Sequence, residues 1–365
     1  MKVMVFPYDF EFLPIFKNRH LLKDIIIKYL VSPSGFGLTG KDGCFFNNEI
    51  DSGIIIQDHM TKEDLMDIDA VWLTESLNKL NDEEIKTTIN TIGQYAKQII
   101  YTPNGDKEFE QNINELCKKY NLKVTMPRDY IDLYKLVDER TIVSSFTLRK
   151  FETPVITVLG ICGMTQKFDI QLYLRSHFLK NGYKVSQIGT KQACEILGFH
   201  SIPDFLFEKN YSEVEKILKF NSFIKEIEKK EKPDLIIIGV PDAIIPLNRK
   251  HHLGFGIPAY EICSAIQSDF SILSMFNGEY SNDFFDEMSK VCKYRLNIEL
   301  DAFFISNYTP ISNSLDQENL VFTYTKGTEK INDRYPIYNV RNLNDDKLFN
   351  HVVKKLAMYG EFSVM

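Results

Sequence analysis

The chain lacks any apolar run of the ~18–20 residues that a bilayer crossing requires. Its first residues, MKVMVFPYDFEF, carry an acidic residue by position 9 and no extended apolar stretch, so we expect no signal peptide. Six cysteines are scattered without a C-x-x-C pair or metal-ligand spacing, which is typical of reduced thiols. These absences predict a cytoplasmic protein without a membrane partner or a metal site.

The chain also lacks a basic stripe. Its formal net charge is −7 and its lysines and arginines are spread along the sequence, which argues against a nucleic-acid partner. No G-x-S-x-G elbow, H-E-x-x-H motif or glycosidase-like carboxylate pair can be singled out. Tryptophan occurs once against 27 Phe and 18 Tyr, so the excess of aromatic residues predicts a dense aromatic core.

Short strand-like runs alternate with helical stretches along almost all of the 365 residues. This alternation predicts an α/β protein with mainly parallel sheets covered by helices. The length fits two domains, and the polar stretch over residues 127–152 is typical of a connector. We therefore expect domains over residues 1–145 and 150–365, with the boundary near residues 140–152.

In the first domain, strands are expected at Lys2–Phe6, Asp24–Val31, Gly53–Gln57, Ala70–Thr74, Gln98–Thr102 and Leu122–Thr125. In the second, they are expected at Pro154–Gly160, Tyr183–Ile188, Leu235–Ile238, Phe270–Met275, Leu300–Ser306, Leu320–Thr325 and Ile337–Val340. Helices are expected at Asp82–Lys97, Lys107–Tyr120, Lys167–Lys180, Ser212–Lys230 and Asp345–Tyr359.

The most informative segment is VITVLGICGMTQKFDIQLYLRSHFLKNGYKV, residues 155–185, which is a strand, a glycine-bearing turn, a lysine and a helix. Backbone N–H groups at such a turn bind an anion, and the lysine adds a mobile positive charge. The segment departs from the pattern G-x-x-x-x-G-K-[ST]. The loop after Gly160 is one residue longer, Gln166 replaces the second glycine, and Phe168 follows Lys167 where a hydroxyl would hold Mg²⁺.

Thr165 could supply a hydroxyl from the other side of the lysine. The alternative for the whole segment is an ordinary turn between strand and helix, with an exposed lysine at the start of the helix. A lysine there opposes the helix dipole, which favours an anionic partner.

Three further features follow strands that we expect in the second domain. Asp242 ends the apolar strand of KPDLIIIGVPD and could hold Mg²⁺ through water, or could cap the next turn. Asn307 follows the strand Leu300–Ser306 and could contact a base or ribose, although a turn-forming asparagine is commoner. Arg249–His252 form a basic loop, for which a solvated surface is the alternative. We predict that Lys167, Asp242 and Asn307 converge on one cleft with this loop at its rim.

The first domain contains a literal G-x-G-x-x-G at Gly35, Gly37 and Gly40. A dinucleotide fingerprint requires a helix directly after these glycines. Here Lys41-Asp42-Gly43 and further turn-forming residues follow instead, so we reject a dinucleotide site at this loop.

At these motifs the chain resembles the peptide maturation system proteins of clostridial ribosomal-peptide clusters, encoded beside radical-SAM maturases and Cys-rich precursor peptides. The resemblance runs nearly end to end and rests on PYDFEFLPIF, VSPSGFGLTGKDG, GMTQKFDIQLYLRSHFLKNGYKVSQIG, GFHSIPDF, PDLIIIGVPDAIIP and FGIPAYE. The second half is more distantly similar to P-loop proteins of the dethiobiotin-synthetase and MinD-like kind. That similarity implies Gly160 and Gly163 as loop glycines, Lys167 as the phosphate lysine and Asp242 as the acid at a strand end.

We therefore expect a Rossmann-like domain followed by a P-loop-like domain with an altered phosphate loop. The predicted function is accessory to peptide maturation, with ATP or GTP as the implied ligand and Mg²⁺ left open. The implied partners are the precursor peptide and the maturation enzymes. The alternatives are a non-catalytic scaffold that recognises the precursor peptide and an ATP-dependent enzyme that activates a carboxylate. The sequence alone does not decide whether the chain is an enzyme.

Overall fold

The structure is a computed structural model, which describes residues 1–44, 51–96, 98–103, 105–127, 147–317, 320–325 and 332–361. Contacts divide the chain into two compact units. Unit 1 comprises Met1–Asp132 and Lys191–Phe199, and unit 2 comprises Leu133–Thr190 and His200–Met365. The predicted two-domain α/β fold is confirmed. The predicted connector and boundary lie largely outside the described residues, and the limits 1–145 and 150–365 stay a prediction.

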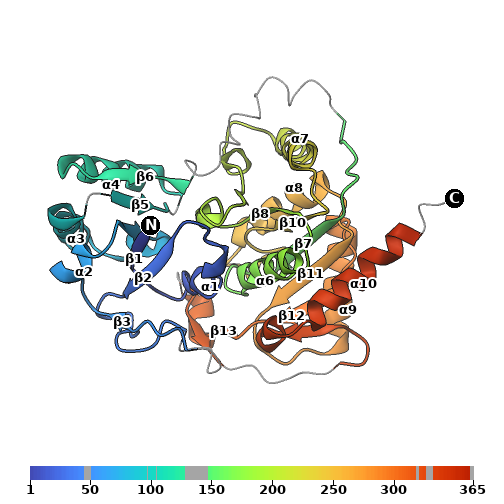
Figure 1. Ribbon diagram of the computed structural model, residues 1–365. Coiled ribbons are helices and arrows are strands. Elements are labelled where there is room, and N and C mark those ends of the chain that lie inside the picture. The colour runs from blue at the N-terminus through green and yellow to red at the C-terminus, as the bar shows by residue number, and fades with distance from the viewer. Residues whose placement is uncertain are drawn as a thin grey trace. The chain divides into compact units, whose positions relative to one another are not determined.

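Unit 1 contains a parallel sheet of six strands in the order β3-β2-β1-β4-β5-β6 (Figure 1). The strands are β1 (Lys2–Phe6), β2 (Ile26–Val31), β3 (Ile56–Gln57), β4 (Ala70–Leu73), β5 (Gln98–Tyr101) and β6 (Lys123–Thr125). The order places β1 and β4 side by side at the centre, with the chain leaving β1 toward one edge and returning to β4 on the other side.

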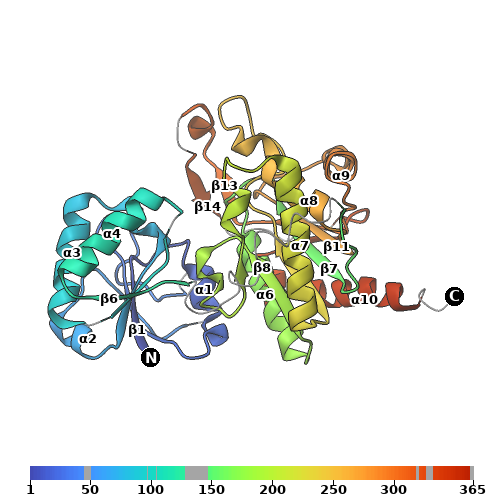
Figure 2. The same cartoon turned by 90° about the horizontal axis from the view of Figure 1, so that it is seen from above.

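The helices of unit 1 are α1 (Leu13–Lys17), α2 (Lys62–Met66), α3 (Asp82–Tyr95) and α4 (Lys107–Lys119). The helix α3 starts with a capping box between Asn81 and Glu84 and buries Ile85, Ile89 and Ile92 at helical spacing. These side chains belong to a core that also includes residues of α4 and of the central strands. In Figure 2, α3 and α4 lie side by side on one face of this sheet.

The loop with the G-x-G-x-x-G pattern lies in unit 1. Gly35, Gly37 and Gly40 all have positive φ, and the chain then forms turns and an antiparallel bridge from Asp42 to Ile55. The described residues directly after Gly40, up to Cys44, thus form turns where a dinucleotide fingerprint needs a helix.

Unit 2 contains a parallel sheet of seven strands in the order β15-β12-β11-β7-β10-β8-β9. The strands are β7 (Val155–Gly160), β8 (Val185–Gly189), β9 (His200–Ser201), β10 (Leu235–Gly239), β11 (Phe270–Met275), β12 (Ala302–Ile305) and β15 (Ile337–Asn339). The three central strands, β11, β7 and β10, are buried along their whole length, as expected for a sheet with helices on both faces.

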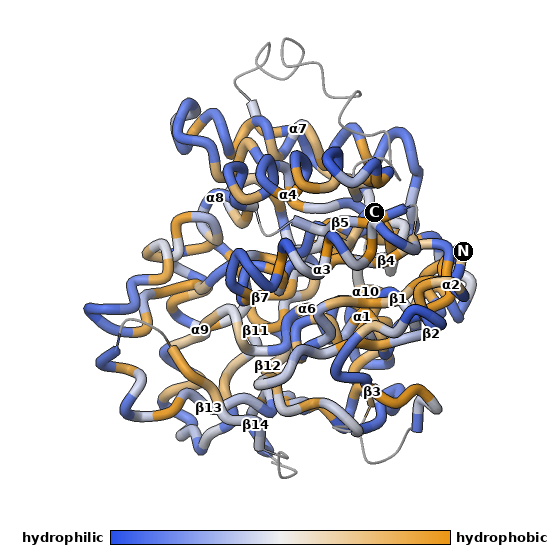
Figure 3. Tube along the Cα trace, turned by 90° about the vertical axis from the view of Figure 1, so that its left-hand side faces the viewer, coloured by the Kyte–Doolittle hydropathy of each residue, from blue (hydrophilic) through white to orange (hydrophobic). Residues whose placement is uncertain are grey.

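The helices of unit 2 are α6 (Lys167–Lys180), α7 (Glu213–Glu231), α8 (Ile257–Ala265), α9 (Asn282–Leu296) and α10 (Lys347–Glu361). One face of the sheet forms a core with α6 and α10, which includes Phe178 and Phe349 in an edge-to-face contact. The helices α7, α8 and α9 form a consecutive row of contacts. Hydrophobic and hydrophilic residues alternate along α7, as Figure 3 shows, and one side of the helix is buried.

A small antiparallel hairpin of β13 (Tyr308–Pro310) and β14 (Phe322–Tyr324) follows β12. The predicted strand at Leu320–Thr325 therefore belongs to this hairpin and not to the parallel sheet. Among the residues that the structure describes, no helix combines the length and apolar character needed to cross a membrane.

Candidate phosphate-binding site

The features predicted in the second half meet at the carboxyl edge of the unit 2 sheet. The strand β7 ends at Gly160 and leads through residues 161–166 into α6, and its neighbour β10 ends at Gly239, three residues before Asp242. Two strands away on the other side, β12 ends just before Asn307. Because all these strands are parallel, their carboxyl ends share one edge, which is where open α/β sheets bind ligands.

The loop after β7 is held in one conformation by its neighbours. A Cβ atom at Gly160 would lie 2.6 Å from Lys167 Cδ and 2.7 Å from Thr165 Oγ1, so a larger residue there would require these two side chains to shift. The hydroxyl of Ser274 on β11 donates to the carbonyl oxygen of Thr165, and the Ile161 amide donates to the carbonyl oxygen of Ser274 at 3.0 Å. The loop is therefore fastened to the adjacent strand before any ligand binds.

Gln166 occupies the position where the phosphate-loop pattern has its second glycine. Its φ is +61°, a left-handed conformation that glycine adopts without strain and that costs other residues about 1–2 kcal/mol. The Gln166 side chain offsets part of this cost, because its Oε1 accepts a hydrogen bond from the main-chain N–H of Asn307 at 2.7 Å. The substitution thus keeps the backbone shape of the pattern and ties the loop to the end of β12.

Lys167 is the first residue of α6, and its side chain is buried, with 5% of the residue exposed. The expectation of an exposed lysine, offered as the ordinary alternative, is wrong. The Nζ atom donates a hydrogen bond to the main-chain carbonyl oxygen of Asp242. Burial lowers the pKa of Lys167 to about 8, although the nearby Asp242 carboxylate acts in the opposite direction. The site therefore holds an ammonium group whose hydrogen bond goes to a carbonyl and not to a carboxylate.

The hydroxyl and thiol groups of the loop point inward. The Thr165 hydroxyl is fully buried and donates to the carbonyl oxygen of Cys162 at 3.0 Å. Main-chain N–H groups of Gly163 and Met164 lie against the Cys162 thiol, whose pKa is raised by burial. Thr165 therefore stabilises the loop, in a position that does not suit the metal-ligand role considered from the sequence.

The donor set for Mg²⁺ is poor. Phe168, which is buried, stands where a phosphate loop has its hydroxyl ligand, and Asp242 is the single acid that the sequence predicted for this site. Among the described residues, no group of three or more His, Cys, Asp or Glu side chains could hold a metal ion. The residues present do not fit a resident metal, and no reaction step is assigned to one.

A left-handed turn lies beside Asp242 and was not predicted from the sequence. Leu253, Gly254, Phe255 and Gly256 all have φ between +46° and +69°, and Asp242 itself has φ +53°. A Cβ atom at Gly256 would collide with the Ile244 carbonyl oxygen, so this turn packs directly on the backbone that follows β10. The two glycines, two residues apart, were the available signal, but the positive φ of Leu253 and Phe255 had none. Strain of this kind in consecutive residues is typical of functional loops.

The basic loop before this turn is only partly solvated. Arg249 is exposed, and Lys250 donates to the carbonyl oxygen of Asp316 at 2.8 Å. His251 is buried, which corrects the expectation of a solvated residue, whereas His252 is exposed and stacks on the half-exposed Phe255 ring with centroids 4.8 Å apart. An exposed aromatic surface thus follows the basic loop on the Asp242 side of the site.

Asn307 is buried, and its Nδ2 donates to the Tyr324 hydroxyl at 2.9 Å. The main-chain N–H of Asn307 also donates to Gln166 Oε1, so Asn307 links the phosphate loop to the β13–β14 hairpin. The structure therefore brings Lys167 close to Asp242 and brings Gln166 close to Asn307, while a cleft between them and a contact of Asn307 with a base stay predictions.

Comparisons with known proteins give information on the fold. No family model matches the chain, and no curated protein is significantly similar to it. A DUF1611 family protein from Anabaena variabilis is similar in structure, with a TM-score of 0.51 and 10% identity over 83% of this chain and 87% of that one. At this identity the likeness shows the fold alone.

Two other solved structures are more distant. A pseudomurein peptide ligase type C from Methanothermus fervidus gives a TM-score of 0.28 and 11% identity, over 87% of this chain and 47% of that one. A D-lactate dehydrogenase with NAD⁺ from Lactobacillus jensenii gives a TM-score of 0.23 and 14% identity, over 98% and 95%. Scores this low carry no argument about function. The resemblances to the peptide maturation family and to dethiobiotin-synthetase-like proteins stay predictions.

Proposed function

We propose that the loop from Gly160 to Lys167 binds the phosphate groups of a nucleotide, ATP or GTP, or of another phosphorylated ligand. The observation that carries the proposal is the buried ammonium group of Lys167 at the start of α6. A buried charge is unfavourable unless it is paired, and the partner of this one is a carbonyl oxygen. A phosphate would add a negative charge to that of the nearby Asp242 carboxylate, at a helix N-terminus where an anion is also favoured by the helix dipole.

The surrounding residues support binding better than hydrolysis. Gly160, Gln166 and Ser274 fix the loop in place, so little ordering is required when an anion arrives. Phe168 removes the hydroxyl that positions Mg²⁺ in active phosphate-loop enzymes. We therefore propose a nucleotide-binding protein that turns over its ligand slowly.

The biological role follows from the sequence resemblance. We propose a cytoplasmic accessory protein of ribosomally synthesised peptide maturation, whose partners are the precursor peptide and the maturation enzymes. This role can be tested by fluorescence anisotropy with the labelled Cys-rich precursor peptide, in the presence and absence of the nucleotide. Binding of the peptide that is independent of every nucleotide would support the alternative, a scaffold that has lost nucleotide binding.

The phosphate site is tested by thermal shift and titration calorimetry with ATP, GTP, ADP and inorganic phosphate, each with and without Mg²⁺, since a bound ligand raises apparent stability. Lys167→Met should weaken the affinity about 10- to 100-fold, because a charge-assisted hydrogen bond is lost. Methionine is chosen because Lys167 is buried, and truncation to alanine would leave a cavity.

Lys180→Met is the matched control, since Lys180 is the exposed last residue of the same helix. It should bind like the wild type. Equal affinity in the Lys167 variant and in the wild type would refute the phosphate-loop assignment.

A further inference from the structure

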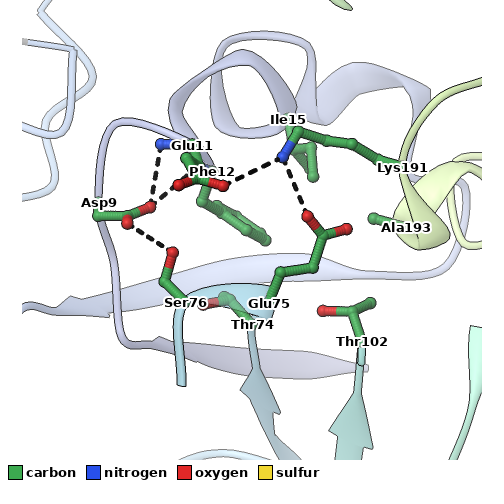
Figure 4. Close-up of a pocket in the computed structure, with 10 residues that line it drawn as sticks. All are labelled: Asp9, Glu11, Phe12, Ile15, Thr74, Glu75, Ser76, Thr102, Lys191 and Ala193. Carbon is green, nitrogen blue, oxygen red and sulfur yellow. Dashed lines mark hydrogen bonds and ion pairs between the residues drawn. The ribbon is translucent and has the colours of Figure 1, made fainter. Parts of the chain in front are cut away.

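Unit 1 has a small pocket at the carboxyl ends of its central strands (Figure 4). Asp9 follows β1, Thr74, Glu75 and Ser76 follow β4, and Thr102 follows β5. The remaining lining residues are Glu11, Phe12, Ile15, Lys191 and Ala193. In the strand order β3-β2-β1-β4-β5-β6, the chain adds strands on one side of β1 up to β3 and then on the other side from β4 onward. Open α/β sheets bind ligands at such a switch point, beyond the carboxyl ends of the strands.

The pocket is not built for a dinucleotide. In dinucleotide-binding proteins, the N–H groups of the first turn after β1 bind the pyrophosphate. Here Asp9 Oδ1 accepts hydrogen bonds from the main-chain N–H groups of Glu11, at 3.0 Å, and of Phe12, at 3.3 Å. The carboxylate of the protein thus occupies the place of a bound anion, and it would repel a phosphate from outside.

The charges around the pocket are unequal. Lys79 Nζ lies 2.7 Å from both Asp9 Oδ2 and Glu11 Oε1. Figure 4 shows Lys191 joined to both Glu75 and Glu11. Its Nζ atom lies 3.1 Å from Glu75 Oε2 and 3.8 Å from Glu11 Oε2. Among the residues that the structure describes around this pocket, three carboxylates therefore face two ammonium groups, which leaves one negative charge in excess.

One carboxylate oxygen has no partner for a hydrogen bond. Glu75 Oε1 is buried and accepts none from the described part of the chain, whereas Glu75 Oε2 is taken by Lys191. The nearby hydroxyls are engaged, since Thr74 donates to the carbonyl oxygen of Pro7 and Thr102 to that of Leu73. A buried oxygen left in this state is unfavourable, so the pocket requires a hydrogen-bond donor.

We propose that this pocket binds the protonated amino group of a small primary amine, with Glu75 Oε1 as its acceptor. A third ammonium group balances the three carboxylates and satisfies the unpartnered oxygen. The pocket is small and so receives the amino group itself, with the rest of the ligand outside. This site belongs to unit 1 and is independent of the phosphate site proposed in unit 2.

The probes for this site are methylammonium, putrescine and the twenty α-amino acids, each compared with the corresponding acid or alcohol that lacks the amine. Binding is measured on the full chain by thermal shift and titration calorimetry. At least one amine should stabilise the wild type, and its amine-free counterpart should not. Glu75→Gln should lower the affinity for that amine at least tenfold. The exposed Glu83→Gln on α3 removes the same charge elsewhere in unit 1 and should leave the affinity unchanged.

If Glu75→Gln does not fold, Glu75→Asp keeps the negative charge that pairs with Lys191 but shortens the side chain by one methylene. This variant should also lower the affinity for the amine. Stabilisation by the amine-free compounds alone, no effect of any amine, or equal affinity in the Glu75 variant would each overturn the proposal. Because Glu75 lies outside the phosphate loop, nucleotide binding should be the same in Glu75→Gln and in the wild type.

Discussion

Replacing Lys167 by methionine should make unit 2 more stable while it weakens phosphate binding. Burial lowers the pKa of this lysine from its ordinary 10.5 to about 8, so the folded protein holds the proton less tightly than the unfolded chain. At about 1.4 kcal/mol for each pH unit, the charged side chain reduces the free energy of unfolding by about 3 kcal/mol at neutral pH. Losing the hydrogen bond to the Asp242 carbonyl offsets about 1 kcal/mol of the gain.

The pH dependence identifies the cause of this gain. Between about pH 8 and 10.5 the unfolded chain binds more protons than the folded one, so the stability of the wild type rises with pH in that interval. Methionine does not titrate, and the variant lacks this rise. The variant should therefore be more stable by about 2 kcal/mol below about pH 8; the difference should disappear near pH 9.5 and reverse to about 1 kcal/mol in favour of the wild type as the pH approaches 10.5.

The assay is urea unfolding at several pH values, followed by far-ultraviolet circular dichroism and by fluorescence. The single tryptophan, Trp72, lies in β4 of unit 1, so a transition seen by circular dichroism without a change in fluorescence belongs to unit 2. Lys180→Met should shift neither the midpoint nor its pH dependence. A lower stability of Lys167→Met at neutral pH, or a gain that is the same at every pH, would refute the reasoning.

Three further predictions concern unit 2. The affinity for a fully ionised phosphate group should fall about tenfold per pH unit above about pH 8, because Lys167 then loses the proton that the anion requires; a flat calorimetric profile above pH 8 would contradict it. A phosphate-release assay should find hydrolysis of ATP and GTP far slower than the ~1–100 s⁻¹ of active phosphoryl-transfer enzymes, and a rate in that range would show that Phe168 does not prevent catalysis. Gly256→Ala should lower the free energy of unfolding by more than ~2 kcal/mol, since it combines a φ of +69° with a clash against the Ile244 carbonyl oxygen. Gly182→Ala, with φ +82° and open space, should lose only ~1 kcal/mol, and equal losses would mean that the left-handed turn is not closely packed.

The regular elements could be predicted where local signals are strong. Lys2–Phe6, Phe270–Met275 and the helix Lys167–Lys180 have the predicted limits, because a dense apolar run or a clear start signal marks each one. The helix α9 was missed, although Ser281 caps it and its buried residues Phe285, Met288, Cys292 and Leu296 follow helical spacing. The cap and this spacing together are sufficient to indicate the helix.

The sites could be predicted only in part. The glycine and lysine pattern indicates the turn after β7, but nothing local reveals that Lys167 is buried or that Gln166 contacts Asn307, 141 residues away. The pocket of unit 1 was not predicted at all, because Lys191 meets Glu75 across 116 residues of sequence. Such pairs depend on tertiary packing, which has no short-range pattern.

The segment Lys191–Phe199 has a consequence for how the protein is made. It buries Ala193, Cys194, Ile196, Leu197 and Phe199, and its contacts belong to unit 1 although the flanking strands β8 and β9 belong to unit 2. During synthesis, unit 1 therefore cannot reach its final packing when residue 132 leaves the ribosome. Its final packing requires the synthesis of the first two strands of the next sheet, β7 and β8, and of the segment that follows them. An excised fragment that ends near residue 132 would expose the apolar surface that this segment covers, and it would lack Lys191 as the counter-charge of Glu75.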